Sequence, residues 1–547
     1  MNKGILLILV SLFALITACD SVHKVDLIVK NAKIYTLDND FSVQEAFAVK
    51  DGKFIAIGSN KDICSKYEAA EVLDLNGKSV YPGFIDAHAH FFGYGLGIQT
   101  EAQLYETKSE QEILNILQSF QSEKQNPWII GRGWDQNDWE KNEFPNKDGL
   151  DKLFPDTPVY LVRIDGHAAW VNSKALELAG ITSTTQISGG EIVKQNGKPS
   201  GILIDNAMSL VRSLIPKSDK NAQIKALLAA QKNCFEVGLT GVTDAGLDLN
   251  QIKLIDSLQK SSMLKMRINA MISPTEENFN YFLEKGPYVT DYLSVRTIKL
   301  YADGALGSRG AALLKPYTDD LNNYGLMIKE ENYYRDICKK ALKYNYQVAT
   351  HAIGDSANRV MLKIYAESLG GMNDKRWRIE HAQIINSADF DYFGNYSIVP
   401  SVQPTHATSD MYWADERVGD ERIIGAYAFK QLLEQNQWIP LGTDFPIEKI
   451  DPVLTFYAAV IRKDINNYPT TGFQMENALS REEALKGMTI WAAKSAFEEK
   501  NKGSIEHGKY ADFIVLNQDI MTCNQNEILN TLVELTSVGG AIVYRRN

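Results

Sequence analysis

Two histidines one residue apart, His88 and His90, are the first residues in the chain whose type and spacing indicate chemistry. They follow an apolar stretch that turns at Pro82 and Gly83, so they are expected at the carboxyl end of a strand. Positions i and i+2 of a strand point to the same face, which lets both imidazoles reach one point. Neutral imidazole is a common ligand of zinc-like cations. A His-x-His pair alone is equally compatible with two surface histidines, so the metal interpretation depends on further ligands.

Four more polar residues fall at or near the ends of predicted strands: Lys299, His351, His381 and Asp444. In a barrel of parallel strands, all strand ends of one kind lie on the same face, and catalytic residues gather there. Four histidines, a lysine and an aspartate on one such face predict a metal site.

The elements that must position these residues alternate between apolar strands and helical stretches, which favours a parallel sheet built from βα units. With the strand that ends at His88, the predicted strands number eight, as in a (β/α)₈ barrel. The seven others are expected at 239–243, 265–271, 295–301, 346–351, 377–381, 398–403 and 438–443. Helices are expected at 221–237, 331–344 and 357–369. The fold class is therefore α/β, with a TIM-like barrel over 83–502.

Two further parts of the chain do not fit a barrel. Residues from about 95 to 206 are far longer than an ordinary crossover, which predicts an inserted α+β subdomain over the barrel mouth. Both ends of the chain, 19–82 and 503–547, show short β-runs with turns such as Asp51-Gly52 and Asn76-Gly77. Two β-rich ends around a mixed middle predict one composite β-sandwich built from both termini.

The N-terminus predicts export. Lys3 precedes an apolar run at 4–16, which is too short to span a bilayer and is typical of a signal peptide. The run ends in Ile16-Thr17-Ala18-Cys19, which resembles a bacterial lipobox. We therefore expect residues 1–18 to be removed and Cys19 to be lipidated, which would attach the protein to a bacterial membrane on its periplasmic or outer-surface side. The alternatives are a short hydrophobic anchor, or a chance cysteine after an ordinary signal peptide.

Composition excludes some partners. The net charge is −11 and no basic tract stands out, which argues against a nucleic-acid partner. Cys64, Cys234, Cys338 and Cys523 are scattered, so no disulfide framework is expected. A homo-oligomer is compatible with the sequence, which leaves the oligomeric state open.

Three segments resemble one family. Residues 299–309 (KLYADGALGSR), 351–355 (HAIGD) and 442–446 (GTDFP) resemble the amidohydrolase superfamily of metal-dependent hydrolases, in the branch that includes N-substituted formamide deformylases. The resemblance extends from Val25 to the C-terminus. It implies a composite β-sandwich beside the barrel, with one or two divalent ions, zinc by expectation.

The same resemblance implies a role for each metal ligand. His88 and His90 would hold the more buried ion, together with Asp444, and His351 and His381 would hold the second. Lys299 matches the position that is carboxylated on Nζ in binuclear members and bridges both ions. The alternative is a structural lysine paired with Asp303, since an ammonium group would be repelled by two cations.

The expected reaction is hydrolysis of an amide-type C–N bond of a small molecule, of the N-formyl or N-acyl kind, by metal-activated hydroxide. Asp444 would orient the hydroxide and carry its proton to the leaving nitrogen. His167, Arg309 and His406 are candidates for substrate contact, although packing or ion pairing would also account for each. Two other functions stay open: a deaminase or cyclic amidase of the same fold, and a ligand-binding lipoprotein without catalysis.

Overall fold

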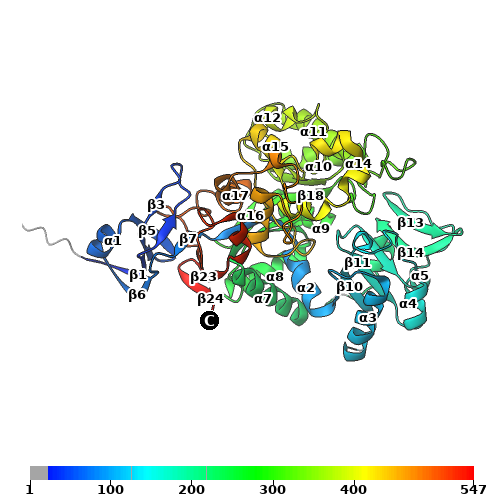
Figure 1. Ribbon diagram of the computed structural model, residues 1–547, viewed down its shortest axis with the longest axis horizontal. Helices are drawn as coiled ribbons and strands as arrows, with labels where there is room; N and C mark the ends of the chain where they lie inside the picture. Colours follow the sequence, from blue (N-terminus) through cyan, green and yellow to red (C-terminus); the bar gives the residue numbers. More distant parts are fainter. Residues whose placement is uncertain (1–21, 125, 217) are drawn as a thin grey trace, which may run out of the picture.

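The computed structural model describes residues 22–124, 126–216 and 218–547 (Figure 1). The predicted signal peptide and Cys19 lie outside these residues. Within the described part of the chain, no helix has both the length and the apolar character needed to cross a membrane.

A parallel sheet that curves into a barrel forms the centre of the molecule. Its neighbouring strands pair in the order β8, β15, β16, β18, β19, β20 and β21, all of them parallel. Their bounds are β8 (Phe84–Ala89), β15 (Leu239–Leu247), β16 (Arg267–Ile272), β18 (Leu293–Tyr301), β19 (Gln347–Ala352), β20 (Arg378–His381) and β21 (Val399–Ser401). A short strand, β17 (Tyr288–Val289), pairs antiparallel with β18.

The segment that leads to Asp444 closes the barrel between β21 and β8. Leu441 forms a parallel bridge with Val402, and the Ala87 amide donates to the Leu441 carbonyl over 3.1 Å. Pro440 has no N–H to donate, which accounts for the irregular backbone of this eighth strand. A Cβ at Gly442 would lie 2.6 Å from the backbone nitrogen of His88, so this close approach requires glycine. The predicted (β/α)₈ fold class is confirmed, with an irregular last strand.

Helices surround the barrel in the manner of βα units (Figure 1). α8 is representative, because it buries Ile252, Ile255 and Leu258 along one face. The helices that follow the first barrel strand and its insertion are α7 (Lys220–Glu236), α8 (Leu249–Lys260), α9 (Glu276–Phe282), α10 (Glu331–Tyr344), α11 (Asp355–Leu369), α12 (Asp391–Asn395), α13 (Pro404–Asp410), α14 (Ala414–Arg422), α15 (Phe429–Asn436), α16 (Pro452–Ile461), α17 (Arg481–Gly487) and α18 (Ile490–Ser495).

Both chain ends contribute to a pair of sheets beside the barrel. One sheet has the order β5-β4-β1-β6, and the other has the order β24-β23-β22-β7-β2-β3, in which C-terminal β22 pairs with N-terminal β7. Phe47, Phe54 and Phe513 pack edge to face in the core that the two sheets share. The bounds are β1 (His23–Lys30), β2 (Lys33–Tyr35), β3 (Val43–Gln44), β4 (Ala46–Lys50), β5 (Lys53–Gly58), α1 (Asn60–Lys66), β6 (Tyr67–Asp74), β7 (Ser79–Pro82), β22 (Phe513–Leu516), β23 (Val533–Val538) and β24 (Ala541–Arg545).

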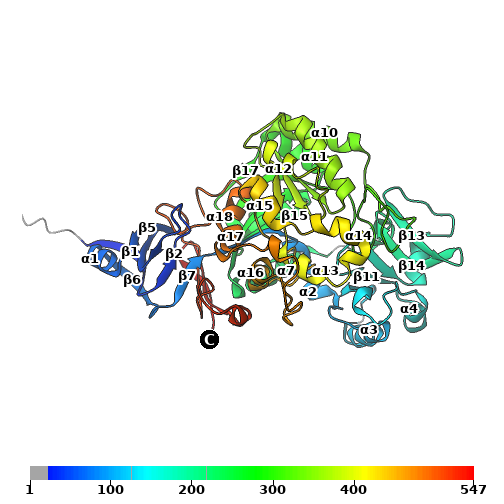
Figure 2. The same cartoon turned by 45° about the horizontal axis from the view of Figure 1, so that its top comes forward.

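The insertion between β8 and β15 has a sheet and a core of its own. Its strand order is β13-β14-β12-β11-β10-β9, and Trp134 and Trp170 are buried in its centre. Figures 1 and 2 both place it at the opposite end of the molecule from the terminal sheets. Its elements are α2 (Phe91–Thr100), β9 (Ala102–Gln103), α3 (Glu110–Lys124), β10 (Ile129–Trp134), α4 (Asp148–Leu153), β11 (Val159–Arg163), β12 (Ala168–Val171), α5 (Ser173–Leu178), β13 (Gly190–Gln195), β14 (Lys198–Asp205) and α6 (Met208–Arg212). The residue limits predicted for these parts stay predictions.

A buried ion pair joins the barrel to the C-terminal part of the β-sandwich. Arg267 of β16 donates to both carboxylate oxygens of Asp512, over 2.6 and 2.9 Å. Both side chains are less than 5% exposed, and the guanidinium also packs over the Tyr510 ring. Separating the barrel from the β-sandwich would leave a buried charge unpaired, which is costly, so this pair holds the two parts together.

Replacing Asp512 by alanine is expected to lower the free energy of unfolding by about 3–5 kcal/mol, because Arg267 is left buried without a counter-charge. Denaturant unfolding followed by circular dichroism measures the change. Glu421→Ala, which removes an exposed pair with Lys315, is the matched control and should have little effect. Equal stability of the two variants would contradict a stabilising role for the buried pair.

Candidate metal centre

Asp444 brings the two histidines of the His-x-His pair together. His88 lies on β8 and is 1% exposed, whereas His90 follows the strand and precedes the first residue of α2. The Nε2 atoms of His88 and His90 lie 3.6 and 3.3 Å from Oδ1 of Asp444. The Asp444 amide donates to the His88 carbonyl over 2.8 Å, which fixes the aspartate beside the end of β8.

A buried carboxylate sets the orientation of His88. Nδ1 of His88 hydrogen-bonds to Glu380, which in turn accepts from Nε and Nη2 of Arg378 over 2.6 and 2.9 Å. Burial would raise the pKa of Glu380, but attraction to Arg378 and His88 outweighs it and holds that pKa well below its ordinary value. An ionised carboxylate only accepts hydrogen bonds, so the proton of His88 belongs on Nδ1. Nε2 therefore presents its lone pair to the barrel mouth.

His381 is oriented in the same way by an amide. Its Nδ1 lies 2.7 Å from Oε1 of Gln403, which leaves Nε2 free. The rings of His351 and His381 lie 4.6 Å apart, and those of His88 and His381 lie 5.0 Å apart. Burial first, and then neighbouring positive charge, lowers the pKa of His351 and of His381 well below the ordinary value, and brings that of His88 to about 4. All three imidazoles are therefore neutral at pH 7, the form that binds metal.

The donor set fits a divalent metal ion. One ligand atom each of His88, His381 and Asp444 can be chosen so that all three lie within 4.8 Å of one another, and all three residues are buried. Oδ1 of Asp444 is buried and accepts no aligned hydrogen bond in the part of the chain that the structure describes. An ionised carboxylate that is buried and unsatisfied in this way is costly unless a cation shares the site. Two imidazole nitrogens and one carboxylate oxygen are ligands that zinc-like ions prefer.

Lys299 points into the same site. Its side chain is fully buried, and its Nζ lies 3.2 Å from Nε2 of His88. Burial is the main cause that lowers the pKa of Lys299, to about 8. Asp303 accepts instead from the backbone amides of Ala312, Ile353 and Gly354 at 2.8–3.0 Å. The alternative in which Lys299 pairs with Asp303 is thus not seen among the described residues.

The structure brings two of the three candidate substrate residues to the site. His167, in the insertion, places its ring 4.9 Å from that of His351, and its Nδ1 lies 2.7 Å from Oδ1 of Asp205. His406 of α13 places its Nε2 3.6 Å from Oδ2 of Asp444. Arg309 is not brought to the site. It binds Asp319 over 2.8 Å and does not line the cavity described below, because its loop turns toward that carboxylate.

The sequence did not lead us to predict the residues that orient His88, His381 and His167: Arg378, Glu380, Gln403 and Asp205. A signal for two of them was present. Arg378 and Glu380 are two positions apart on one short strand, so both side chains share one face and must satisfy each other when buried. Gln403 and Asp205 carried no comparable local signal, because their partners are distant in sequence.

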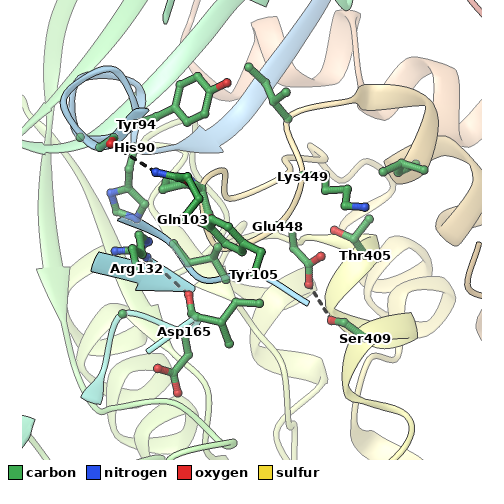
Figure 3. Close-up of a pocket in the computed structure, with 18 of the residues that line it drawn as sticks. His90, Tyr94, Gln103, Tyr105, Arg132, Asp165, Thr405, Ser409, Glu448 and Lys449 are labelled. Atoms are coloured by element: carbon green, nitrogen blue, oxygen red, sulfur yellow. Dashed lines mark hydrogen bonds between the residues drawn. The ribbon is translucent and has the colours of Figure 1, made fainter. Parts of the chain in front are cut away.

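A cavity of about 1510 Å³ opens over the site. The insertion supplies one wall, and loops that follow the last barrel strands supply another, as Figure 3 shows. Its lining includes His90, Arg132, His167, Tyr301, Trp413 and Glu448. A cavity of this size holds a small organic molecule, and His90 and His167 are the histidines of the site that line it.

The family model described as "Amidohydrolase family" matches residues 71–544. The chain belongs to the amidohydrolase family. This confirms the resemblance seen in the sequence and makes the protein a hydrolase of a family that is typically metal-dependent, in agreement with the His-His-Asp cluster.

Individual proteins also match over almost the whole chain. YtcJ of Bacillus subtilis (strain 168) is 33% identical over 94% of this chain and 98% of its own. The N-substituted formamide deformylase of Arthrobacter pascens is 25% identical over 95% of this chain and 98% of its own. A crystal structure of an uncharacterized metal-dependent hydrolase from Pyrococcus horikoshii OT3 has 28% identity and a TM-score of 0.74, covering 91% of this chain and 99% of that one.

Glu380→Gln is expected to weaken zinc binding about 10- to 100-fold, because a neutral amide holds the proton of His88 on Nδ1 less strongly than a carboxylate and can also turn its NH2 group toward the ring. Dialysis against a zinc chelator, followed by metal analysis, measures the affinity. Glu434→Gln, at an exposed position on α15, is the control. Gln403→Met removes the partner of His381 without leaving an arginine unpaired, so it tests the same idea if Glu380→Gln folds poorly. Unchanged zinc affinity in both variants would contradict the role assigned to these partners.

Proposed function

We propose that the protein hydrolyses an amide-type C–N bond of a small molecule, of the N-formyl or N-acyl kind. The observation that carries this proposal is the unsatisfied Asp444 oxygen beside neutral His88 and His381. His90, whose Nε2 lies 3.3 Å from that oxygen, lines a large cavity. The relative from Arthrobacter pascens, which is named for deformylation of N-substituted formamides, supports the choice of bond.

The proposed ligands divide into two groups. His88, His90 and Asp444 would hold one ion, and His351 and His381 would hold a second. Lys299 would bridge the two after its neutral Nζ adds to carbon dioxide, forming an N–C bond and losing a proton to give a carbamate. The burial of Nζ next to His88, without a carboxylate within 4 Å in the described residues, supports this assignment.

Metal analysis of the wild-type protein should then give two zinc ions per chain, and one ion would contradict the bridge.

The chain's own residues orient the substrate and move protons. When bound, a zinc-like ion lowers the pKa of a coordinated water to about 7 and polarises a carbonyl oxygen. Burial would raise the pKa of Asp444, but the contact with His90 is the main cause that holds this pKa well below the ordinary value, so Asp444 is ionised. Its carboxylate can accept the proton of the attacking water and pass it to the leaving nitrogen. His167, held by Asp205, faces the cavity and can donate to the substrate oxygen.

Asp444→Asn is expected to lower kcat by about 100-fold or more, because an amide cannot accept the proton. The zinc-loaded enzyme is screened with N-formyl and N-acyl amines, and released amine is the readout. Asp391→Asn, at an exposed position on α12, is the control. Release of ammonia from amino-heterocycles, without amine release, would favour a deaminase instead. Ligand binding without any turnover, unchanged in Asp444→Asn, would favour a binding protein.

We also propose that the protein is exported and attached to a bacterial membrane through lipidated Cys19. The support comes from the sequence alone: Lys3, the apolar run at 4–16 and the residues before Cys19.

Cys19→Ala should abolish incorporation of a labelled fatty acid and move the protein from the detergent phase to the aqueous phase. Cys64→Ala, which removes an exposed free cysteine, should change neither result. Equal labelling of the Cys19 variant and the wild type would refute lipidation at Cys19.

A further inference from the structure

Arg132 extends from β10 of the insertion to the wall of the cavity, where Figure 3 shows it in the same close-up as His90 and Tyr105. Its Nη2 makes one long hydrogen bond, of 3.4 Å, to the Ile164 carbonyl. Its Nε is buried and has no hydrogen-bond partner in the described part of the chain. A guanidinium carries five donors, so most of the capacity of this group is unused.

The turn beside His167 is built close to this guanidinium. A Cβ on Gly166 would lie 3.3 Å from Nη2 of Arg132, and Gly166 has a φ of +76° that other residues rarely adopt. The glycine therefore lets the backbone approach the guanidinium closely. As a consequence, Arg132 lies against the same turn that holds His167 over His351.

Arg132 has no carboxylate within 4 Å among residues 22–124, 126–216 and 218–547, although several carboxylates line the cavity. Asp165 is held by Arg163 over 2.6 Å, and Glu448 accepts from Ser409 on the other side of the cavity in Figure 3. Glu101 is within electrostatic range, but its burial outweighs the attraction of the arginines and raises its pKa.

Arg212 makes this end of the cavity more positive still. It also lines the wall, and no carboxylate lies within 4 Å of it in the same described ranges. Two arginines near one glutamate, Glu101, therefore give a locally positive wall in a chain whose net charge is −11.

We propose that Arg132 binds a carboxylate of the substrate, so that the preferred substrates are N-acyl or N-formyl compounds that carry a carboxylate, such as N-acyl amino acids. This inference rests on the function proposed above. Guanidinium and carboxylate groups fit each other through two parallel hydrogen bonds, and the two Nη atoms of Arg132, of which Nη2 makes only the long bond to Ile164, offer that geometry. The amide of such a substrate lies toward the metal ligands, and its carboxylate lies toward the insertion.

The test compares each acid with the analogue that lacks only its carboxylate: N-acetylphenylalanine with N-(2-phenylethyl)acetamide, and N-acetylleucine with N-(3-methylbutyl)acetamide, with the formyl counterparts in parallel. With the zinc-loaded enzyme, Arg132→Gln should lower kcat/KM for the acids about 10- to 100-fold, chiefly through KM, because charged hydrogen bonds are lost. The values for the neutral analogues should stay unchanged. Arg132→Lys should restore part of the effect, because it retains the charge without the fork.

Arg335→Gln is the control, since Arg335 pairs with glutamates on the outer helices and does not line the cavity. Equal rates for acids and neutral analogues, unchanged in Arg132→Gln, would overturn the inference and leave the proposed hydrolysis intact.

A calorimetric titration of the zinc-loaded protein with the same compounds separates the two proposals. If no compound is hydrolysed, the proposed function fails, but tighter binding of the acids that depends on Arg132 would still support the inference. Equal binding of acids and neutral analogues, or no binding of either, would overturn it.

Discussion

The ion pair between Arg378 and Glu380 determines the protonation of the metal centre. A carboxyl group buried this deeply would favour its neutral form, and a neutral carboxyl could donate to His88 as easily as accept from it. Arg378 removes that ambiguity by binding both oxygens. The ionised Glu380 then holds the proton on one side of the imidazole and leaves the other side for a cation. Replacing the pair by apolar residues could preserve the packing but would leave His88 without a defined tautomer.

The other ligands depend on how the barrel closes. The last strand is irregular at Pro440, yet Gly442 lets it pass against β8 closely enough for Asp444 to reach the His88 backbone. Asp444 then stands between His88, His90 and His406. The same closure that completes the sheet thus places the one carboxylate of the cluster.

The sequence was sufficient for the barrel and for the residues at its strand ends. Parallel strands have their carboxyl ends on one face, so His351, His381 and Asp444 could be placed together without knowing any contact. The insertion was different, because the position of β10 over the mouth depends on packing between residues far apart in the chain. The sequence around Arg309 and Arg132 does not show which of the two faces the cavity. In the tertiary structure, Arg309 is neutralised by Asp319, whereas Arg132 lines the cavity.

The sheet shared by both chain ends has a consequence for the order of folding. β7 is synthesised early, but its partner β22 belongs to the last part of the chain to be made. Until then, the edge of β7 that faces β22 is left without its hydrogen-bonding partner, and such edges promote association with other chains. Completion of this sheet and formation of the Arg267–Asp512 pair must follow synthesis of the whole barrel. The two ends of the polypeptide can therefore pair with each other only after the barrel between them has been synthesised.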